Sequence, residues 1–431
     1  MPQFIRRHAD TFIALGIFVV ALAVYNATLC PSLSYKSPDG NELATIPYVL
    51  GLAHSPGYPL YTWLGKLFTF IPVGDVAHRI NLMSATLGAG GVALLYGIMR
   101  LLGAGRLTST FTALYFAFSR TFWSQTGIAE VYAPNVFMVA LTLWLLLRYE
   151  QRTSPVYLVL AAGCFGLSLG THLSNLGFAL GIAVFVLLVD WRVLKRPGVV
   201  LGAMAAFLLG TLQFLWLPYK AGSTNDPLLL RHDLRTLEGL YRYTLGAFPQ
   251  FKFAFPLQLI PDRIVLYLYL LRQNVGLGGI LLGVYGMAEV LVRRTRHFYL
   301  FILMYLVHVF FFVQYRVFDL DVFFIPAHML YIIFIGYGVD RLIGYGGELI
   351  RRAGGSAGGR FLRAAGSVGL AAVLALAVGG QVQANWEVND YSQDTAISDF
   401  YANVFEMLPP GSVMLGRGGV FGYDMFYWRL V

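Results

Sequence analysis

The few charged side chains of this chain divide it into apolar stretches of the length that crosses a lipid bilayer. Only 12% of its 431 residues are Asp, Glu, Lys or Arg, compared with roughly 25% in ordinary soluble domains. A helix crosses the hydrocarbon core in about 20 apolar residues. Ten uncharged stretches have lengths in this range or near it: 11–35, 80–99, 107–119, 131–147, 153–189, 197–219, 273–288, 297–315, 322–339 and 364–386.

The fifth stretch is long enough for two helices, because a polar break at 170–175 lies near its middle. The pattern therefore predicts an all-α, polytopic integral membrane protein with about 11 transmembrane helices. A mean hydropathy of +0.65 excludes a disordered chain, a fibrous repeat and a conventional soluble enzyme. The apolar run after Arg6 and Arg7 is long for a signal peptide, so we interpret it as a retained first helix.

The distribution of Lys and Arg predicts the orientation in the membrane. With a cytoplasmic N-terminus, 17 of the 31 basic residues fall inside, whereas 16 of the 22 acidic residues fall outside. The net charge of +9 is then a topology signal and predicts no nucleic-acid partner. We expect a multi-pass protein of the bacterial cytoplasmic membrane with its C-terminus outside. Its transmembrane domain covers 1–386, with outer loops 30–79 and 220–275, and a short extracytoplasmic segment covers 387–431.

The first outer loop has the most unusual composition. Asp39 and Glu42 follow a turn sequence, and Ser55-Pro56-Gly57-Tyr58-Pro59 is predicted to form a rigid turn that presents His54 and Tyr58. Two short apolar segments, 42–54 and 58–71, suit helices that lie in the membrane interface. A carboxylate beside a His and a Tyr is suited to removing a proton from an acceptor hydroxyl. The alternative is that Asp39 only caps a helix and His54 is an ordinary interfacial side chain.

Two further polar clusters are predicted on the same face of the membrane. Glu130, Tyr132 and Asn135 open the fourth span, at a depth where polar groups commonly serve function; the helix dipole alone also explains a carboxylate there. His172 lies in the turn between spans five and six, as a binding residue or as a hydrogen-bonded turn residue. No second His stands at ligand spacing from it, and neither do Cys30 and Cys164, so we predict no metal site made by protein ligands alone.

The fourth outer cluster joins spans nine and ten and contains Arg316, Asp319 and Asp321. These residues suit a clamp for a sugar or a phosphate, or an ion pair that closes a turn. The 220–275 loop adds basic and aromatic side chains, which fit an anionic lipid or interfacial anchoring. Ionisable residues within the spans are few. This arrangement favours an enzyme that works at the outer leaflet over a carrier with a site at the midplane.

Several of these motifs resemble the transmembrane protein O-mannosyltransferase family. The first is Asp39-x-x-Glu42 followed by Ala53-His54-Ser55-Pro56-Gly57-Tyr58-Pro59-Leu60-Tyr61. The others, in the expected order, are Asn81-Leu82-Met83-Ser84-Ala85, Phe122-Trp123-Ser124-Gln125 with Ala129-Glu130-Val131-Tyr132-Ala133-x-Asn135, Gly166-Leu167-Ser168-Leu169-Gly170-Thr171-His172, and Asp319-x-Asp321-Val322-Phe323-Phe324-Ile325-Pro326.

The resemblance implies a GT-C glycosyltransferase that takes a hexose, mannose-like, from a polyprenyl-phosphate donor at the extracytoplasmic face. It also implies that the first outer loop supplies the acidic catalytic residue, which Asp39 matches. We therefore expect an inverting transfer to a hydroxyl of a protein or glycan acceptor, with Glu42, His54 and Tyr58 orienting the acceptor or Asp39. The departing phosphate needs positive charge, for which we expect Arg79, Arg120, His172 or Arg316.

No cofactor beyond the lipid-linked donor is expected, and a requirement for a divalent ion is left open. The main alternative function is a lipid or solute transporter of the cell envelope. A second alternative is a non-catalytic scaffold for glycan assembly. Membrane lipids, the polyprenyl-phosphate sugar and the acceptor are the expected partners.

Overall fold

The computed structural model describes residues 3–36, 38–223, 234–245, 249–353, 357–409, 411–412, 427–428 and 430–431, and these residues form helices and connecting turns without a strand. The α-helices are α1 (Gln3–Ala27), α2 (Pro38–Val49), α3 (Pro59–Phe68), α4 (Val76–Leu101), α5 (Arg106–Ala117), α6 (Arg120–Ser124), α7 (Tyr132–Arg152), α8 (Pro155–Ser168), α9 (Ala179–Asp190), α10 (Pro197–Thr211), α11 (Trp216–Ser223), α12 (Leu237–Thr244), α13 (Ile260–Arg293), α14 (Thr295–Val313), α15 (Leu320–Phe323), α16 (Ile325–Ala353), α17 (Ala357–Asn389) and α18 (Ala396–Met407).

Short 3-10 helices extend or connect several of these elements. They are η1 (Leu173–Phe178), η2 (Trp191–Lys195), η3 (Leu212–Leu215), η4 (Pro249–Phe251) and η5 (Leu257–Leu259). The first two flank α9, so that residues 173–195 form one continuous helical segment. The polar break predicted at 170–175 is thus a real turn between two helices, as the sequence indicated.

Within the described residues, eight helical segments are long and apolar enough to cross a membrane. They contain α1, α4, α7, α9, α10, α13, α14 and α17. The other three predicted spans correspond to α5, α8 and α16, of which α5 and α8 have only 12 and 14 residues. A multi-pass, all-helical membrane protein is therefore confirmed, whereas the count of 11 spans stays a prediction.

The bundle is held together by close helix crossings at glycines. A Cβ on Gly166 of α8 would lie 2.3 Å from the carbonyl oxygen of Phe207 in α10, and one on Gly286 of α13 would lie 1.9 Å from that of Phe334 in α16. Small residues let helix backbones approach in this way inside membranes, where packing replaces the hydrophobic effect between helices. These crossings fix the positions of the helix ends that carry the polar clusters.

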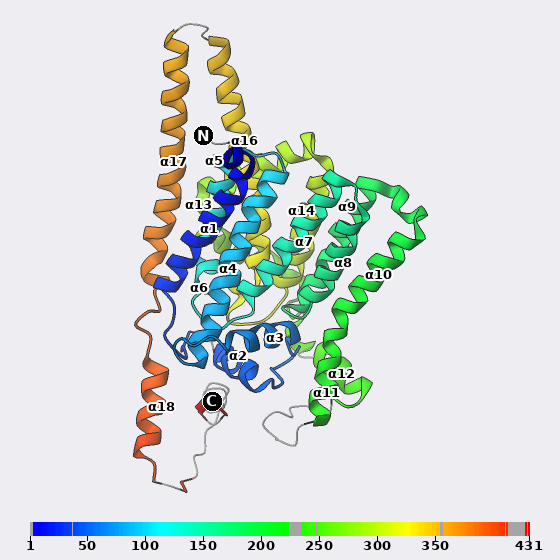
Figure 1. Ribbon diagram of the computed structural model, residues 1–431, viewed down its shortest axis with the longest axis vertical. Helices are drawn as coiled ribbons and strands as arrows, with labels where there is room; N and C mark the ends of the chain where they lie inside the picture. Colours follow the sequence, from blue (N-terminus) through cyan, green and yellow to red (C-terminus); the bar gives the residue numbers. More distant parts are fainter. Residues whose placement is uncertain are drawn as a thin grey trace.

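The segments predicted on one side of the membrane lie at one end of the bundle. Figure 1 shows α2, α3, α11, α12 and α18 at this end, with the beginning of α1, the end of α16 and the beginning of α17 at the other. The first loop contains two short helices, α2 and α3, as predicted. The 387–431 segment begins with the last turn of α17 and contains α18, whereas residues 413–426 lie outside the described part of the chain. The domain boundary at 386 stays a prediction.

The basic run 351–364 is helical on both sides of residues 354–356. α16 continues to Ala353 and α17 begins at Ala357, and the two helices extend well beyond the rest of the bundle (Figure 1). Arg and Ala favour helix, and Glu348 and Arg352 form an i,i+4 ion pair of 2.8 Å that supports it. The glycines of this run therefore do not prevent helix formation on either side of 354–356.

Candidate active site

A cavity of about 650 Å³ lies at the end of the bundle that carries α2 and α3, and all four polar clusters of the sequence reach it. The volume is within the range of small-molecule sites, roughly 300 to 1,000 Å³. Its polar lining comes from separate parts of the chain and includes Asp39, His54, Ser55, Tyr58, Glu130, Tyr132, His172, Ser174, Thr244, Lys252, His308, Tyr315 and Asp319. Its apolar wall includes Leu176, Val307, Phe311, Phe312, Phe318 and Phe323.

The first turn of α2 places a carboxylate at the cavity. Pro38 begins the helix, where its lack of an N–H has no cost, and Asp39 occupies the first turn, where the helix dipole favours a negative charge. The Asp39 side chain is 49% exposed, so a substrate can reach it. Glu42 lies one turn further along the helix and its side chain is fully buried.

His54 links these two carboxylates. Its Nδ1 lies 2.5 Å from Oε2 of Glu42, and its Nε2 lies 3.8 Å from Oδ2 of Asp39. Burial disfavours the charged imidazole, but the negative charges of Glu42 and, more weakly, Asp39 and Glu130 outweigh this effect and raise the pKa of His54 to about 9. At neutral pH the site therefore contains an imidazolium between two carboxylates, which fixes the position of Asp39.

The turn after His54 is fixed by contacts from α11 and α12. Gly57 has φ +98°, and a Cβ there would lie 2.7 Å from Cδ2 of Leu217 in α11. The Tyr243 hydroxyl donates a hydrogen bond to the carbonyl of Ala53, and Ser55 Oγ donates one to the carbonyl of Tyr243. Tyr58 packs edge-to-face on His54 at 5.2 Å between ring centroids. The turn thus presents both rings to the cavity as predicted.

The second and third clusters form the adjacent wall. Glu130 is 5% exposed and Tyr132 is 7% exposed, and both line the cavity. The Tyr132 and His172 rings lie 5.9 Å apart, and each contacts Phe323. Burial, and secondarily His308, lower the pKa of His172 to about 3. His172 is therefore neutral at physiological pH, so it supplies a hydrogen bond but no positive charge.

Asn135 lies behind this wall and does not line the cavity. Its Oδ1 accepts hydrogen bonds from Thr171 Oγ1 at 3.0 Å and from Asn175 Nδ2 at 2.6 Å. Asn135 therefore holds the turn that carries His172 against α7. Its place in the structure is that of a positioning residue.

The fourth cluster divides between the cavity and its surroundings. Asp319 lines the cavity, whereas Asp321 in α15 does not. Burial, assisted by the negative charge of Asp39, raises the pKa of Asp319 to about 6. Asp39 and Asp319 thus join Glu130 as carboxylates that line this cavity; the Asp39 side chain is half exposed and Asp319 is largely buried.

We expect Asp319→Asn to stabilise the protein at neutral pH. A raised pKa in the folded state means that the contribution of Asp319 to stability is fully present below its ordinary value of 3.8 and is lost as the pH rises through about 6. Thermal unfolding at pH 7.5 should show a higher midpoint temperature for the variant. The corresponding gain in the free energy of unfolding is at most about 3 kcal/mol. At pH 3.5, below the ordinary pKa of 3.8, the difference should almost disappear. Equal midpoints at both pH values, while the exposed control Asp262→Asn is also neutral, would contradict the buried charge.

The arginines expected to meet the donor phosphate lie outside the cavity lining. Arg79 donates three hydrogen bonds to the carbonyls of Thr69, Val73 and Gly74 and closes the turn before α4. Arg316 donates to the carbonyl of Ala254 and stacks on Phe255. Arg120 is exposed at the start of α6. Of the four basic candidates, only His172 reaches the cavity.

Lys252 is a lining residue that the sequence did not single out from the loop around it. Its Nζ donates a hydrogen bond of 2.7 Å to the carbonyl of Leu245, and it is the one Lys or Arg among the lining residues in the described part of the chain. Partial burial lowers its pKa. In the sequence, Lys252 is one of seven Lys or Arg residues in 220–275, and nothing in the pattern distinguishes it from the other six.

In the described ranges, no group of three or more His, Cys, Asp or Glu is arranged to hold a metal ion.

Comparisons with known proteins bear on this cavity. Residues 39–195 match the family described as "Protein O-mannosyl-transferase TMEM260 N-terminal domain". The resemblance seen in the sequence is confirmed. Protein O-mannosyl-transferase TMEM260 of Mus musculus is 34% identical over 215 residues, covering 48% of this chain and 30% of the mouse protein. The Dictyostelium discoideum protein of the same name is 30% identical over 138 residues, covering 31% and 17%. The chain thus matches less than a third of either curated relative.

Solved structures are similar in fold over nearly the whole chain. ArnT from Cupriavidus metallidurans bound to undecaprenyl phosphate has a TM-score of 0.66 at 15% identity, covering 96% of this chain and 84% of ArnT. An Archaeoglobus fulgidus oligosaccharyltransferase in its apo form has a TM-score of 0.53 at 12% identity, covering 97% and 60%. The chain therefore shares the membrane-protein fold of these two structures over nearly its whole length.

Proposed function

We propose that this protein is an inverting membrane glycosyltransferase that moves a mannose-like hexose from a polyprenyl-phosphate donor to an acceptor hydroxyl, on protein in preference to glycan. The observation that carries the proposal is the meeting of Asp39, His54 and Glu42 in a cavity with one apolar wall. The match to protein O-mannosyltransferases over residues 39–195 contains all three residues and supports the same chemistry. The fold shared with ArnT supports a polyprenyl-phosphate donor.

In this mechanism Asp39 acts as general base. Its carboxylate accepts the proton of the acceptor hydroxyl while the hydroxyl oxygen bonds to the anomeric carbon, and the bond from that carbon to the lipid phosphate breaks. The oxygen attacks the face opposite to the departing phosphate, so the configuration inverts. His54 and Glu42 hold Asp39 in position, and Tyr58, Glu130, Tyr132 and Asp319 provide the polar surface that contacts sugar and acceptor.

The phosphate leaves at low cost only where its charge is met. We assign this role to Lys252, with a hydrogen bond from His172, because both line the cavity. Arg79 and Arg316 then support the surrounding turns, and Arg120 lies exposed outside the cavity. No divalent ion is needed for the step as written.

We place the protein in a bacterial cytoplasmic membrane with the cavity at the extracytoplasmic face. The Lys and Arg bias supports this orientation, as does the gathering of the three outer segments at one end of the bundle (Figure 1). The domain boundaries at 386 and 387 follow from the same assignment.

The test is transfer of labelled hexose by purified protein. Reconstituted vesicles receive polyprenyl-phosphate-[³H]mannose and a peptide that contains Ser and Thr. The proposal expects label in the peptide with inverted anomeric configuration. Label that crosses into the vesicle lumen with no covalent product would instead identify a transporter, and neither product nor uptake would favour a scaffold.

We expect Lys252→Gln to weaken use of the donor. A hydrogen bond to a charged group contributes roughly 1.5–3 kcal/mol, so KM for the lipid-linked donor should rise about 10-fold or more, with a smaller change in kcat. Initial rates over a donor series give both constants. Lys195→Gln, at the opposite end of the bundle in η2, is the matched control. An unchanged KM in Lys252→Gln would contradict the assignment.

A further inference from the structure

A second cavity lies at the end of the bundle opposite to the candidate active site. It has a volume of about 280 Å³ and is lined by Leu102, Gly103, Arg293, Arg294, Tyr337, Asp340 and Arg341. Three elements meet here: the turn from α4 to α5, the junction of α13 with α14, and the second half of α16. The helical segments 257–293 and 295–313, both apolar enough to cross a membrane, end and begin at this point. The cavity is therefore at the depth of lipid headgroups.

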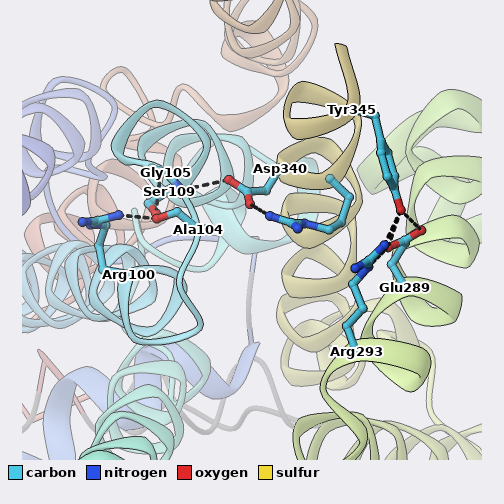
Figure 2. A network of polar contacts seen from close by, with 9 residues as sticks. Arg100, Ala104, Gly105, Ser109, Glu289, Arg293, Asp340 and Tyr345 are labelled. Atoms are coloured by element: carbon cyan, nitrogen blue, oxygen red, sulfur yellow. Dashed lines mark hydrogen bonds and ion pairs between the residues drawn. The ribbon is translucent and has the colours of Figure 1, made fainter. Parts of the chain in front are cut away.

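Two of the three arginines are held in place by neighbouring acceptors. Arg293 Nε lies 2.7 Å from Oε2 of Glu289, and its Nη2 donates to the Tyr345 hydroxyl at 2.6 Å. Arg341 Nη2 lies 2.9 Å from Oδ2 of Asp340. Figure 2 shows these contacts on adjacent helices, with Asp340 also accepting a hydrogen bond from the backbone N–H of Gly105 at 2.8 Å. The guanidinium groups are thus oriented before any ligand arrives.

These contacts leave donors unused. Arg341 Nε is buried and has no hydrogen-bond partner among the described residues, although the guanidinium lies 5.7 Å from the Tyr337 ring. The guanidinium of Arg294 forms no hydrogen bond or ion pair within the described ranges, whereas its backbone is bonded within the helix junction. It stands beside Gly103, where a Cβ would lie 3.4 Å from its Nη2. Gly103 has φ +86°, a conformation suited to glycine, and keeps the mouth of the cavity free of a side chain.

The charge of the lining matches an anion. Three arginines and one aspartate give a net charge of +2, and guanidinium groups bind phosphate oxygens through paired, charge-assisted hydrogen bonds. These arginines could also serve only the bias of Lys and Arg toward the cytoplasmic side, but that bias requires only exposed basic residues. It does not require a cavity with oriented guanidinium groups and an unpartnered buried Nε. Basic pockets between transmembrane helices characteristically bind anionic headgroups.

We propose that this cavity binds the phosphate of an anionic phospholipid headgroup in the leaflet opposite to the active site. Arg294 and Arg341 contact the phosphate, Arg293 adds positive charge from its pair with Glu289, and Asp340 fixes Arg341 and the turn at Gly105. The bound headgroup then bridges three elements: the turn that follows α4, the end of α13, and α16. This site does not depend on the proposed transferase activity.

Lipid binding by the full-length protein in detergent tests the proposal. Native mass spectrometry is used to titrate wild type, Arg294→Gln, and Arg294→Gln with Arg341→Gln against dioleoylphosphatidylglycerol, with dioleoylphosphatidylcholine and inorganic phosphate as separate arms. Arg296→Gln, an exposed arginine two residues away that does not line the cavity, is the matched control. The Arg294 side chain has no hydrogen-bond or ion-pair partner in the described part of the chain, and its backbone bonds do not depend on the side chain, so we expect the single substitution to leave the fold intact.

The expected result is one saturable phosphatidylglycerol per protein, bound at least 10-fold more weakly by Arg294→Gln and by the double variant, and unchanged in Arg296→Gln. Phosphatidylcholine should not saturate the site, and inorganic phosphate at the lipid concentration should not displace the lipid. Equal binding by wild type and both cavity variants would overturn the proposal. Displacement by inorganic phosphate would overturn it as well, because the ligand would then be a free anion.

Discussion

Asp39→Asn should abolish sugar transfer while leaving the protein folded. General base catalysis contributes about 100- to 10,000-fold to a rate, and an amide cannot accept the hydroxyl proton. We expect kcat for labelled-hexose transfer to fall within that range, with little change in KM for the donor. The fold should survive because the side chain is half exposed, and loss of a charge in the first turn of a helix costs roughly 0.3–1 kcal/mol.

The control for this variant makes the same chemical change elsewhere at the same end of the bundle. Asp262 is exposed in the first turn of α13, so Asp262→Asn loses a helix-terminal charge without touching the cavity and should keep wild-type kcat. A single thermal transition near the wild-type midpoint shows that each variant is folded. Full transfer by folded Asp39→Asn would remove Asp39 from the role of base.

The second large effect concerns the buried pair of His54 and Glu42. His54→Ala removes the imidazolium that lies 2.5 Å from a carboxylate with a fully buried side chain. Breaking a buried ion pair from one side costs about 3–5 kcal/mol. We expect a marked fall in the thermal midpoint and loss of transfer, because the turn around Asp39 loses its support.

The double variant, Glu42→Gln with His54→Ala, separates stability from catalysis. It removes the buried charge as well as its partner, so the midpoint should recover in part. Transfer should stay low because Asp39 still lacks the imidazole. Recovery of both properties together would show that His54 acts only through folding, and recovery of neither would show that the pair is not the source of the instability.

The pH dependence of stability gives an independent measurement of the same pair. The folded-state pKa of His54 is raised from 6.5 to about 9. Its stabilising contribution is therefore fully present below pH 6.5 and is lost as the pH rises through about 9. The midpoint of the wild type should fall across that window more steeply than the midpoint of the double variant.

The sequence predicted the parts of the site that depend on local order along the chain. Asp39 and Glu42 stand one helical turn apart, and His54 and Tyr58 flank a turn with its own chemistry, so their joint presentation follows from short-range rules. The charge distribution also placed all four clusters at one end, which the structure confirms. The uncharged stretches located most of the main helices to within a few residues of one end or both, whereas α1 (Gln3–Ala27) begins and ends eight residues before the stretch 11–35.

The sequence does not show which basic residue is positioned to meet the donor phosphate. Arg79, Arg316 and Lys252 all belong to outer segments with similar composition, and which of them faces the cavity depends on how the loops pack on the bundle. Arg79 is occupied by three carbonyls of its own turn, a contact set by the backbone path from 69 to 74. Asp319 lines the cavity and Asp321 does not, and this difference likewise depends on how α15 is oriented, which the periodicity of the sequence does not specify.

The cavity has two walls of different origin along the chain. One wall contains Asp39, His54, Glu130, Tyr132 and His172, which come from within residues 39–195, the region that matches O-mannosyltransferases. The other contains Lys252, Phe312 and Asp319, which come from well beyond it. Substitutions in the later segments can therefore reshape the wall that faces the substrates without disturbing the proton-accepting wall. With the proposed function, this division would let the sugar or the acceptor change while the surroundings of Asp39 stay the same.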